Sequence, residues 1–479
     1  MNYRMVGYLL GVILLIEAVL MLFPTIIGLY FGENIVPFLI TIGIIFAISL
    51  PVAILKPKNT QIYTREGFVT VAAGWVLMSV FGALPFFLGG SIPNYTDAFF
   101  ETVSGFTTTG ATILTQIETL PRGILFWRSF THWIGGMGVL VFMLALLPSA
   151  GGQTMYLMRA EVPGPTKGKL VPKMKHSALI LYGIYVVLTL IEMIALLFCG
   201  LSLYDAAVNS FATAGTGGFS VLNDSIAGYN NPAVEWVIAI FMFIFGINFN
   251  LYFFVLIGKI KDVLKSEELR AYFVLCAMSV IAVAINTAHL FDNIADCFRT
   301  SFFQVTTIMS TTGFTTADFN LWPELSKTIL VILMIIGACA GSTAGGMKVS
   351  RILILVKNII KEIKHMLRPK SVNVIRLDGE VVPDEIARSA NSYLAIYIAT
   401  IIITVLAISV DDLSFESNLT ATLACINNIG PGLDAVGPCG NFSGYSMFSK
   451  IILSLNMLLG RLEIMPIMIL FSPITWKKR

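Results

Sequence analysis

Four short loops, each centred on a glycine and rich in threonine or asparagine, recur along the sequence. They read Thr107-Thr108-Thr109-Gly110-Ala111-Thr112, Ala212-Thr213-Ala214-Gly215-Thr216-Gly217, Ser310-Thr311-Thr312-Gly313-Phe314-Thr315 and Asn427-Asn428-Ile429-Gly430-Pro431-Gly432. Glycine adopts backbone angles that other residues avoid, so such loops can turn successive carbonyl oxygens toward one axis. This chemistry suits a dehydrated cation, because oxygen ligands must replace its lost water shell.

We predict that three consecutive residues of each loop supply these ligands. They are Thr108, Thr109 and Gly110; Thr213, Ala214 and Gly215; Thr311, Thr312 and Gly313; and Asn428, Ile429 and Gly430. The side chains two residues before each glycine add oxygens at the inner mouth. Potassium filters are built from carbonyls of four such loops. The competing interpretation is four polar surface loops with ordinary turn glycines, but four copies at similar spacing favour the filter.

The elements around these loops are those of a membrane protein. Of the 479 residues, 56% are hydrophobic and only 12% are charged, and the mean hydropathy is +0.83. A water-facing globular chain carries about twice that share of charge. Ten apolar blocks are long enough to cross a bilayer, which takes about 20 residues. These blocks are 5–29, 34–55, 67–90, 124–148, 177–200, 233–258, 269–290, 327–365, 390–410 and 447–471.

Four shorter semi-polar segments precede the glycine loops. They cover 94–108, 203–213, 296–310 and 417–428. Segments of this length are too short to span and are typical of re-entrant helices. Their negative C-terminal ends would point into the membrane, where they favour a cation.

The order of segments predicts an all-α polytopic protein with fourfold pseudosymmetry. After an N-terminal helix pair (1–60), the unit of helix, pore loop and helix repeats four times. The expected repeats are 61–150, 151–260, 261–370 and 371–479, and the third carries an intramembrane gating loop. Lys and Arg concentrate in alternate loops, which places both termini in the cytoplasm. We therefore expect a multi-pass protein of the cell's inner (cytoplasmic) membrane.

The block 327–365 is far longer than one membrane crossing needs. Its middle contains Gly341-Ser342-Thr343-Ala344-Gly345-Gly346. Each glycine costs a helix about 1 kcal/mol relative to alanine. We predict an unwound gate here, below the filter. The alternative is close helix packing through a repeated GxxxG pattern.

Arg461 lies inside the last apolar block. A charge at this depth usually faces a polar interior. We predict that Arg461 faces the pore or contacts the gate. A structural pair with another helix is the alternative.

Other features are assigned no chemistry. The polar segment 364–388 contains Asp378-Gly379, a hairpin signal, and is either a docking surface for a cytosolic partner or a solvated loop. Trp127 and Trp133 are interpreted as interfacial anchors, and Arg128 and His132 beside them receive no role. The scattered cysteines and histidines show no metal-site spacing, no enzyme motif occurs, and the small net charge of +3 gives no argument for nucleic acid.

The motifs resemble the Trk/Ktr superfamily of potassium transporters, in its TrkH-like branch. The resemblance covers nearly the whole chain and rests on four stretches: Ser104–Thr112, Ala214–Ser220, Ser310–Thr316 and Gly341–Gly346. It implies a homodimer, one pore per protomer, and a cytosolic ring of nucleotide-binding regulatory subunits (TrkA-like). Some relatives carry serine at the first filter glycine and admit sodium, so the glycines here imply potassium.

From these observations we expect a potassium-selective conducting subunit that mediates uptake and is gated by a cytosolic partner. The ion is potassium as cargo, with no organic cofactor on this chain. Two alternatives stay open: a symporter driven by sodium or protons, and a membrane enzyme, for which no convergent catalytic set is visible.

Overall fold

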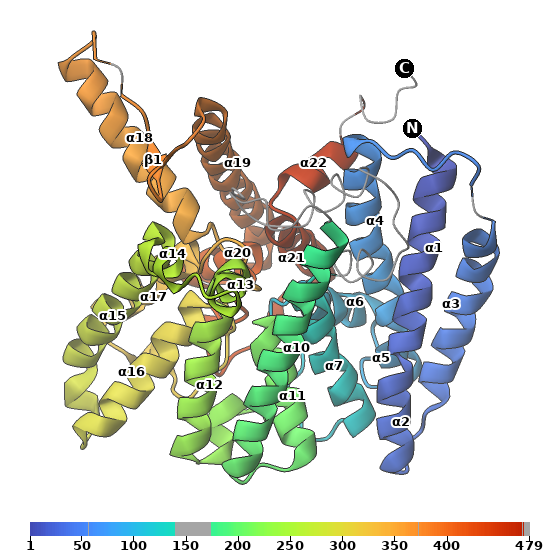
Figure 1. Ribbon diagram of the computed structural model, residues 1–479. Coiled ribbons are helices and arrows are strands. Elements are labelled where there is room, and N and C mark those ends of the chain that lie inside the picture. Colours follow the sequence, from blue (N-terminus) through green and yellow to red (C-terminus); the bar gives the residue numbers. More distant parts are fainter. Residues whose placement is uncertain (56, 139–173, 372, 472, 474–479) are drawn as a thin grey trace.

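The computed structural model describes residues 1–55, 57–138, 174–371, 373–471 and 473 (Figure 1). Within these ranges the regular secondary structure is helical apart from one small hairpin. The fold is the expected all-α membrane architecture. The predicted span 124–148 is described only to residue 138, and the basic segments at 150–178 and 477–479 lie wholly or mostly outside the described residues.

Six helical segments of the described chain are long and apolar enough to cross a membrane. They confirm six of the ten predicted blocks. They are α1 (Tyr3–Leu20) continued by α2 (Leu22–Tyr30), α3 (Val36–Ile54), α4 (Thr64–Gly82) continued by α5 (Leu84–Leu88), α10 (Met174–Phe198), α15 (Glu267–Thr287) and α19 (Asp384–Ile408).

Three further blocks form broken helices, although the sequence predicted a break in only one of them. They are α12 (Pro232–Phe245) with α13 (Phe249–Leu256), α17 (Glu324–Ile336) with α18 (Val349–Leu367), and α21 (Met447–Arg461) with α22 (Met465–Phe471). The first pair bends by 90°. The predicted spans 233–258 and 447–471 are therefore interrupted, and neither is a single helix.

The α12–α13 break is stable because its open backbone groups find partners. The carbonyl of Gly246 accepts from the Cys339 N–H at 3.1 Å, and the Phe249 N–H donates to the Gly341 carbonyl at 2.9 Å. Irregular backbone at membrane depth requires such burial in protein. No local pattern in the sequence indicates this pairing, because the partners lie almost one hundred residues away.

The predicted short segments are helices that end at the glycine loops. They are α6 (Tyr95–Phe106), α11 (Leu203–Gly215), α16 (Ile294–Met309) and α20 (Phe415–Asn427). Each begins with a serine or asparagine N-cap and carries an acidic residue in its first turn. Both features stabilise a helix N-terminus. These four helices are called the pore helices below.

The pore helices are arranged in a ring. Each packs against the second helix of a neighbouring repeat: α11 on α7 (Arg122–Gly136), α16 on α12, α20 on α17, and α6 on α21. The last contact closes the ring, because α6 and α21 come from opposite ends of the chain. This cyclic packing is the structural basis of the pseudo-fourfold arrangement.

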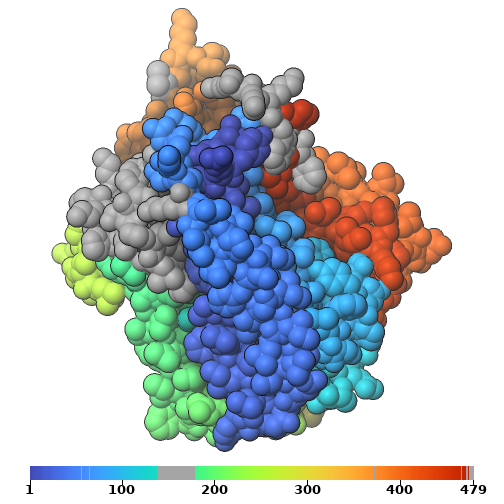
Figure 2. Space-filling model, turned by 90° about the vertical axis from the view of Figure 1, so that its right-hand side faces the viewer, coloured from blue at the N-terminus to red at the C-terminus, as the bar shows by residue number. Residues whose placement is uncertain are grey.

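The N-terminal helices stand outside the ring. Helix α1 packs on α3 and α4, and Figure 2 shows α1–α3 in dark blue covering one side of the molecule. At one end of the bundle lie the start of α1, α22, α18 and the hairpin (Figure 1).

The hairpin pairs β1 (Arg376–Leu377) with β2 (Glu380–Val381) in antiparallel register, with Arg376 opposite Val381. Its turn residues Asp378 and Gly379 have φ of 54° and 81°, as the Asp-Gly signal predicted. The remaining short elements are α14 (Ile260–Lys265) and the 3-10 turns η1 (Ser225–Tyr229), η2 (Ala288–Leu290), η3 (Phe319–Leu321), η4 (Ser409–Asp411), η5 (Asp434–Val436) and η6 (Phe442–Gly444).

Candidate functional site

The first, third and fourth glycine loops share one backbone conformation. In each loop, a residue one or two positions after the end of the pore helix has a left-handed backbone conformation. The glycine two positions later also has a positive φ. The φ values are 57° and 79° for Thr108 and Gly110, 58° and 86° for Thr311 and Gly313, and 54° and 93° for Asn428 and Gly430. Such angles are strained for most residues and easy for glycine.

The second loop lies three residues later than the sequence analysis placed it. Thr213, Ala214 and Gly215 form the last turn of α11. The shared conformation occurs instead at Thr216 and Gly218, with φ of 56° and 76°. The structure therefore places residues 216–218, and not the predicted 213–215, at the position equivalent to the other three loops. A signal was available, since Gly218-Phe219-Ser220 parallels Gly313-Phe314-Thr315.

The four loop glycines and the carbonyls next to them form a closed ring. A Cβ on Gly110 would collide with the carbonyl oxygen of Gly217, one on Gly218 with that of Thr312, and one on Gly313 with that of Ile429. A Cβ on Gly430 would lie 2.9 Å from the carbonyl oxygen of Thr109, which closes the circle. Only glycine lets the four backbones approach this closely, so loops from all four repeats surround one axis.

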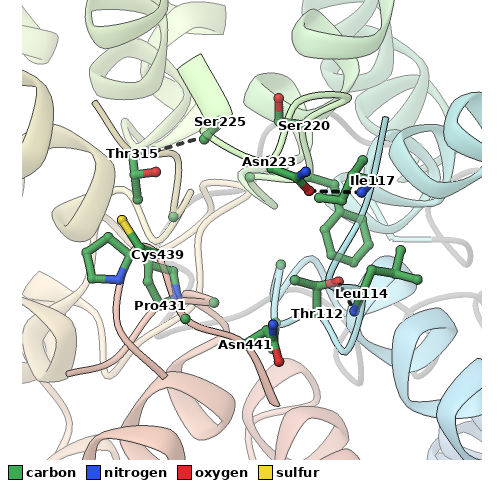
Figure 3. A pocket seen from close by; sticks show the side chains of 18 of the residues that line it. Thr112, Leu114, Ile117, Ser220, Asn223, Ser225, Thr315, Pro431, Cys439 and Asn441 are labelled. Atoms are coloured by element: carbon green, nitrogen blue, oxygen red, sulfur yellow. Dashed lines mark hydrogen bonds between the residues drawn. The ribbon is translucent and has the colours of Figure 1, made fainter. Parts of the chain in front are cut away.

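The outer side of the ring is an open cavity of about 130 Å³ whose lining includes all four glycines (Figure 3). Hydrogen bonds connect the loops around this cavity, and each bond joins two neighbouring repeats. The Ile117 N–H donates to Asn223 Oδ1 at 2.9 Å, and the Thr315 N–H donates to Ser225 Oγ at 3.2 Å. The Phe442 N–H donates to the Thr112 carbonyl at 2.8 Å and joins the last repeat to the first. These contacts fix the mouth around the axis.

An exposed carboxylate beside the mouth is held by hydroxyls. Asp434 Oδ2 accepts from Ser417 Oγ at 2.7 Å and also from Ser414 Oγ. These hydrogen bonds lower the pKa of the Asp434 carboxyl from its ordinary value. Asp434 therefore keeps its negative charge at this mouth of the ring.

The inner side of the ring carries four polar side chains, from Thr108, Thr216, Thr311 and Asn428, all fully buried. Within the described part of the chain, Thr108 Oγ1 and Asn428 Oδ1 have no hydrogen-bond partner. Buried oxygens are rarely left unpaired, and a passing cation or water would satisfy them. No group of three or more His, Cys, Asp or Glu side chains among the described residues is placed to hold a metal ion, so these oxygens and the carbonyls are the candidate ligands.

The predicted gate segment is an irregular loop between α17 and α18, covering residues 337–348. It touches the inner face of the ring. The Gly345 N–H donates to Thr311 Oγ1 at 2.6 Å, and a Cβ on Gly345 would collide with the Asn427 carbonyl. Ser342 Oγ donates to the Cys339 carbonyl at 2.6 Å within the loop. The break is thus an ordered loop that contacts the third and fourth glycine loops, and residues 337–348 are not part of a continuous packed helix.

Arg461 contacts this loop directly. Its Nη1 donates to the Thr343 carbonyl at 2.8 Å, and its Nη2 donates to the carbonyl of Gly135 and, at 2.8 Å, to that of Gly136, the last residue of α7. The guanidinium thus joins α21, α7 and the loop. Glu463 pairs with Arg351 instead, at 3.0 Å.

Several side chains behind the ring were missed by the sequence analysis. His132 Nδ1 lies 2.7 Å from the Gly105 carbonyl, and His132 Nε2 accepts from the Phe219 N–H at 3.3 Å. Arg128 is 2% exposed and pairs with Glu101 at 2.7 Å. Trp127 is fully buried and donates to the Gly82 carbonyl at 3.1 Å, so its interpretation as an interfacial anchor is wrong. A charged residue within an apolar span was the available signal for Arg128.

Comparisons with known proteins agree on one family. A sequence profile of the TrkH family, described as a cation transport protein, matches residues 37–478. The Trk system potassium uptake protein TrkH of Salmonella typhimurium is 37% identical over 492 residues, covering 100% of both chains. The protein TrkG of Escherichia coli K12, of the same system, is 33% identical, covering 99% of both chains. The crystal structure of the potassium transporter TrkH from Vibrio parahaemolyticus superposes with a TM-score of 0.89 at 31% identity, covering 100% of both chains.

Proposed function

This chain belongs to the TrkH family of cation transport proteins, and on that premise we propose that it mediates potassium uptake by conducting potassium through the ring of four loops. The family is one of transporters rather than enzymes. The observation that carries the proposal is the closed ring of contacts between each loop glycine and the carbonyl of the next repeat. Carbonyls from four sides of one axis are the ligands that replace the water shell of potassium.

The proposed ligands are the carbonyl oxygens of Thr109, Gly217, Thr312 and Ile429, with their neighbouring glycines. The four inner side chains extend the site toward the cytoplasm. The C-terminal ends of four pore helices point at the loops, and their partial negative charge favours a cation. Glycine at all four close contacts keeps the backbones at one spacing, which supports selection of potassium over sodium.

The loop 337–348 is the proposed gate. It blocks the inner side through contacts at Thr311 and Asn427, and Arg461 holds it through Thr343. Opening requires these few hydrogen bonds to be exchanged for others. Deletion of Ser342 to Gly345 should raise basal flux and reduce its dependence on any cytosolic regulator. A folded deletion variant with unchanged flux and regulation would rule out the gate.

A path of contacts links the cytosolic hairpin to this gate. Glu267 accepts from the Asp378 N–H at 3.1 Å and pairs with Lys357 on α18. The next residue, Glu268, accepts from the Ala340 N–H at 2.6 Å and from the Ser350 N–H at 3.1 Å. Two consecutive carboxylates at the start of α15 therefore hold the hairpin and both ends of the gate. A regulator bound at the hairpin would act on the gate through them.

The proposed partners are a second copy of the chain and a cytosolic nucleotide-binding ring. Helix α18 projects from the bundle beside the hairpin (Figure 1) and exposes Ile359, Ile363 and Leu367, which supports a protein partner on this side. The proposed location is the cytoplasmic membrane with both termini inside, from the distribution of Lys and Arg. The proposed units remain 1–60, 61–150, 151–260, 261–370 and 371–479.

The test is potassium uptake by cells that lack their own uptake systems. We expect growth at low potassium only when this chain is present together with a cytosolic regulator. Purified protein in liposomes should pass potassium and rubidium far better than sodium. Equal fluxes of sodium and potassium would refute the selective filter.

The symporter alternative predicts a different reversal potential. If flux is passive, the reversal potential follows the potassium gradient alone. If it shifts with external sodium or pH at constant potassium, transport is coupled. In that case the ring remains the potassium site, but the protein transports potassium by alternating between conformations and not by conduction through an open pore.

A further inference from the structure

A buried ion pair behind the ring connects the first loop to the second. Glu101 lies on pore helix α6 and Arg128 on α7, and their side chains are 0% and 2% exposed. Arg128 Nε donates to Glu101 Oε1 at 2.7 Å, while Arg128 Nη1 donates to the Ser220 carbonyl at 2.9 Å. The guanidinium also stacks on the ring of Phe219 at 3.5 Å. Arg128 thus holds two consecutive residues of the second loop.

Glu101 holds the first loop in place in the same way, through hydrogen bonds. Its carboxylate accepts from Thr112 Oγ1 at 2.9 Å and from the Ile113 N–H at 3.1 Å. Ile113 lies three residues after the loop glycine. The pair therefore fixes the outer halves of two adjacent loops with one set of charged hydrogen bonds, which are stronger than neutral ones.

The third and fourth loops are anchored at the same position by neutral side chains from their own pore helices. With the Gln304 amide turned so that both of its groups find partners, its oxygen accepts from the Thr316 N–H at 2.9 Å. Thr420 Oγ1 accepts from the Leu433 N–H at 2.9 Å. Each bonded N–H is again three residues after the loop glycine. One hydrogen bond from the pore helix is thus the common anchor of three loops.

The second loop departs from this rule. Asn209 occupies the position on α11 that Glu101 and Gln304 occupy on their helices, but its amide donates to the Asp205 carbonyl and to Tyr229 Oη, both at 2.9 Å. Arg128 supplies the anchor from the neighbouring repeat instead. Its charge lies against the outer cavity, where an unbalanced cation would oppose potassium entry. This explains why the first pore helix carries a glutamate where the third carries glutamine.

We infer that Arg128 is a positioning residue for the second loop and that Glu101 both neutralises it and anchors the first loop, so that the pair sets the potassium-over-sodium preference of this half of the ring. The inference rests on the proposed function of the ring as a selective filter. It assigns no contact between either side chain and the ion.

The test uses full-length protein with Arg128→Lys. Lysine keeps the charge beside Glu101 but lacks the planar fork that reaches Ser220 and stacks on Phe219. We expect the sodium-to-potassium permeability ratio to rise about tenfold, the factor that corresponds to about 1.4 kcal/mol. We also expect hydrogen exchange of the segment 217–222 to become about tenfold faster, while the segment 311–316 is unchanged. Arg299→Lys is the matched control, because Arg299 lies on a pore helix and pairs with Glu235 at 2.7 Å and Asp296 at 2.6 Å.

The possible outcomes of this experiment either support or overturn the role inferred for Arg128 and Glu101. Unchanged permeability ratio and unchanged exchange in folded Arg128→Lys would overturn the inference, as would an equal change in Arg299→Lys. If Arg128→Lys does not fold, the neutral double variant Glu101→Gln/Arg128→Met replaces it, and parental selectivity there overturns the inference. Failure of both to fold assigns the pair a purely structural role. If the unmutated protein itself does not prefer potassium, the proposed function fails, and local exchange at 217–222 still tests the positioning.

Discussion

Gly110→Ser is the substitution that tests the ring most directly. Gly110 has φ of +79° and faces the carbonyl oxygen of Gly217, with which any Cβ would collide. An L-residue in the left-handed region costs roughly 1–2 kcal/mol, and the Gly217 carbonyl must move in addition. That carbonyl belongs to the proposed cage. Since about 1.4 kcal/mol corresponds to a factor of ten, we expect the sodium-to-potassium permeability ratio to rise by about one order of magnitude.

The assay is the reversal potential, or rubidium uptake in competition with sodium, measured on protein in liposomes. Gly90→Ser is the control for backbone strain. Gly90 has a similar φ of +69°, but a Cβ there would meet no atom within 4 Å. Both variants therefore bear a similar conformational cost, while only Gly110→Ser displaces a ring carbonyl. Parental selectivity in folded Gly110→Ser, or an equal loss in Gly90→Ser, would refute the reasoning.

The remaining predictions concern the loop register, the gate and the outer rim. Thr216→Val should weaken rubidium uptake at low concentration because it removes an inner hydroxyl of the ring, whereas the isosteric Thr213→Val in α11 should not; the reverse result would restore the register expected from sequence. Glu268→Leu should raise basal flux in the absence of a regulator, since both ends of the gate lose their acceptor, and unchanged basal flux in folded protein would contradict this. The lowered pKa of Asp434 means that its hydroxyl contacts stabilise the fold above the ordinary carboxyl pKa and that this contribution is lost as pH falls through the folded-state value. Thermal unfolding of Asp434→Asn should accordingly lose part of the acid sensitivity of the parent, and identical pH profiles would refute the link.

The break in block 327–365 could be located from the sequence, but its contacts could not. The length of block 327–365 and its glycines predicted a broken helix, and the structure has one at 337–348. Its partners, Thr311, Arg461 and Glu268, are 34 to 118 residues away from the atoms they bind. No local pattern encodes contacts at that separation. The same holds for the α12–α13 break, which is stabilised by the gate loop itself.

The second loop shows where sequence reasoning fails. Two glycine-containing triplets, Thr213-Ala214-Gly215 and Thr216-Gly217-Gly218, fit the same motif, and in the sequence only the likeness of the residues after Gly218 to those after Gly313 favours the second. The choice depends on how far α11 extends, and that is fixed by packing: Gly215 lies against the His132 backbone and Gly217 against the His132 ring. The register therefore depends on His132 of α7, a residue for which no role was predicted from the sequence.

What the sequence determined by itself was everything that depends on local composition and periodicity. Apolar length identified six helical segments able to span a membrane. Repeated glycine loops indicated a fourfold cation site, Asp378-Gly379 predicted the hairpin, and polar N-caps with acidic first turns stabilise the pore helices. Tertiary structure alone decided which carbonyl faces which glycine, which oxygens stay unpaired at the inner mouth, and that Arg128 braces a loop of another repeat. The physical reason is that a membrane span or a turn forms according to the segment's own free energy of transfer into the bilayer and its own backbone preference. The geometry of a filter, in contrast, depends on close contacts between segments about one hundred residues apart.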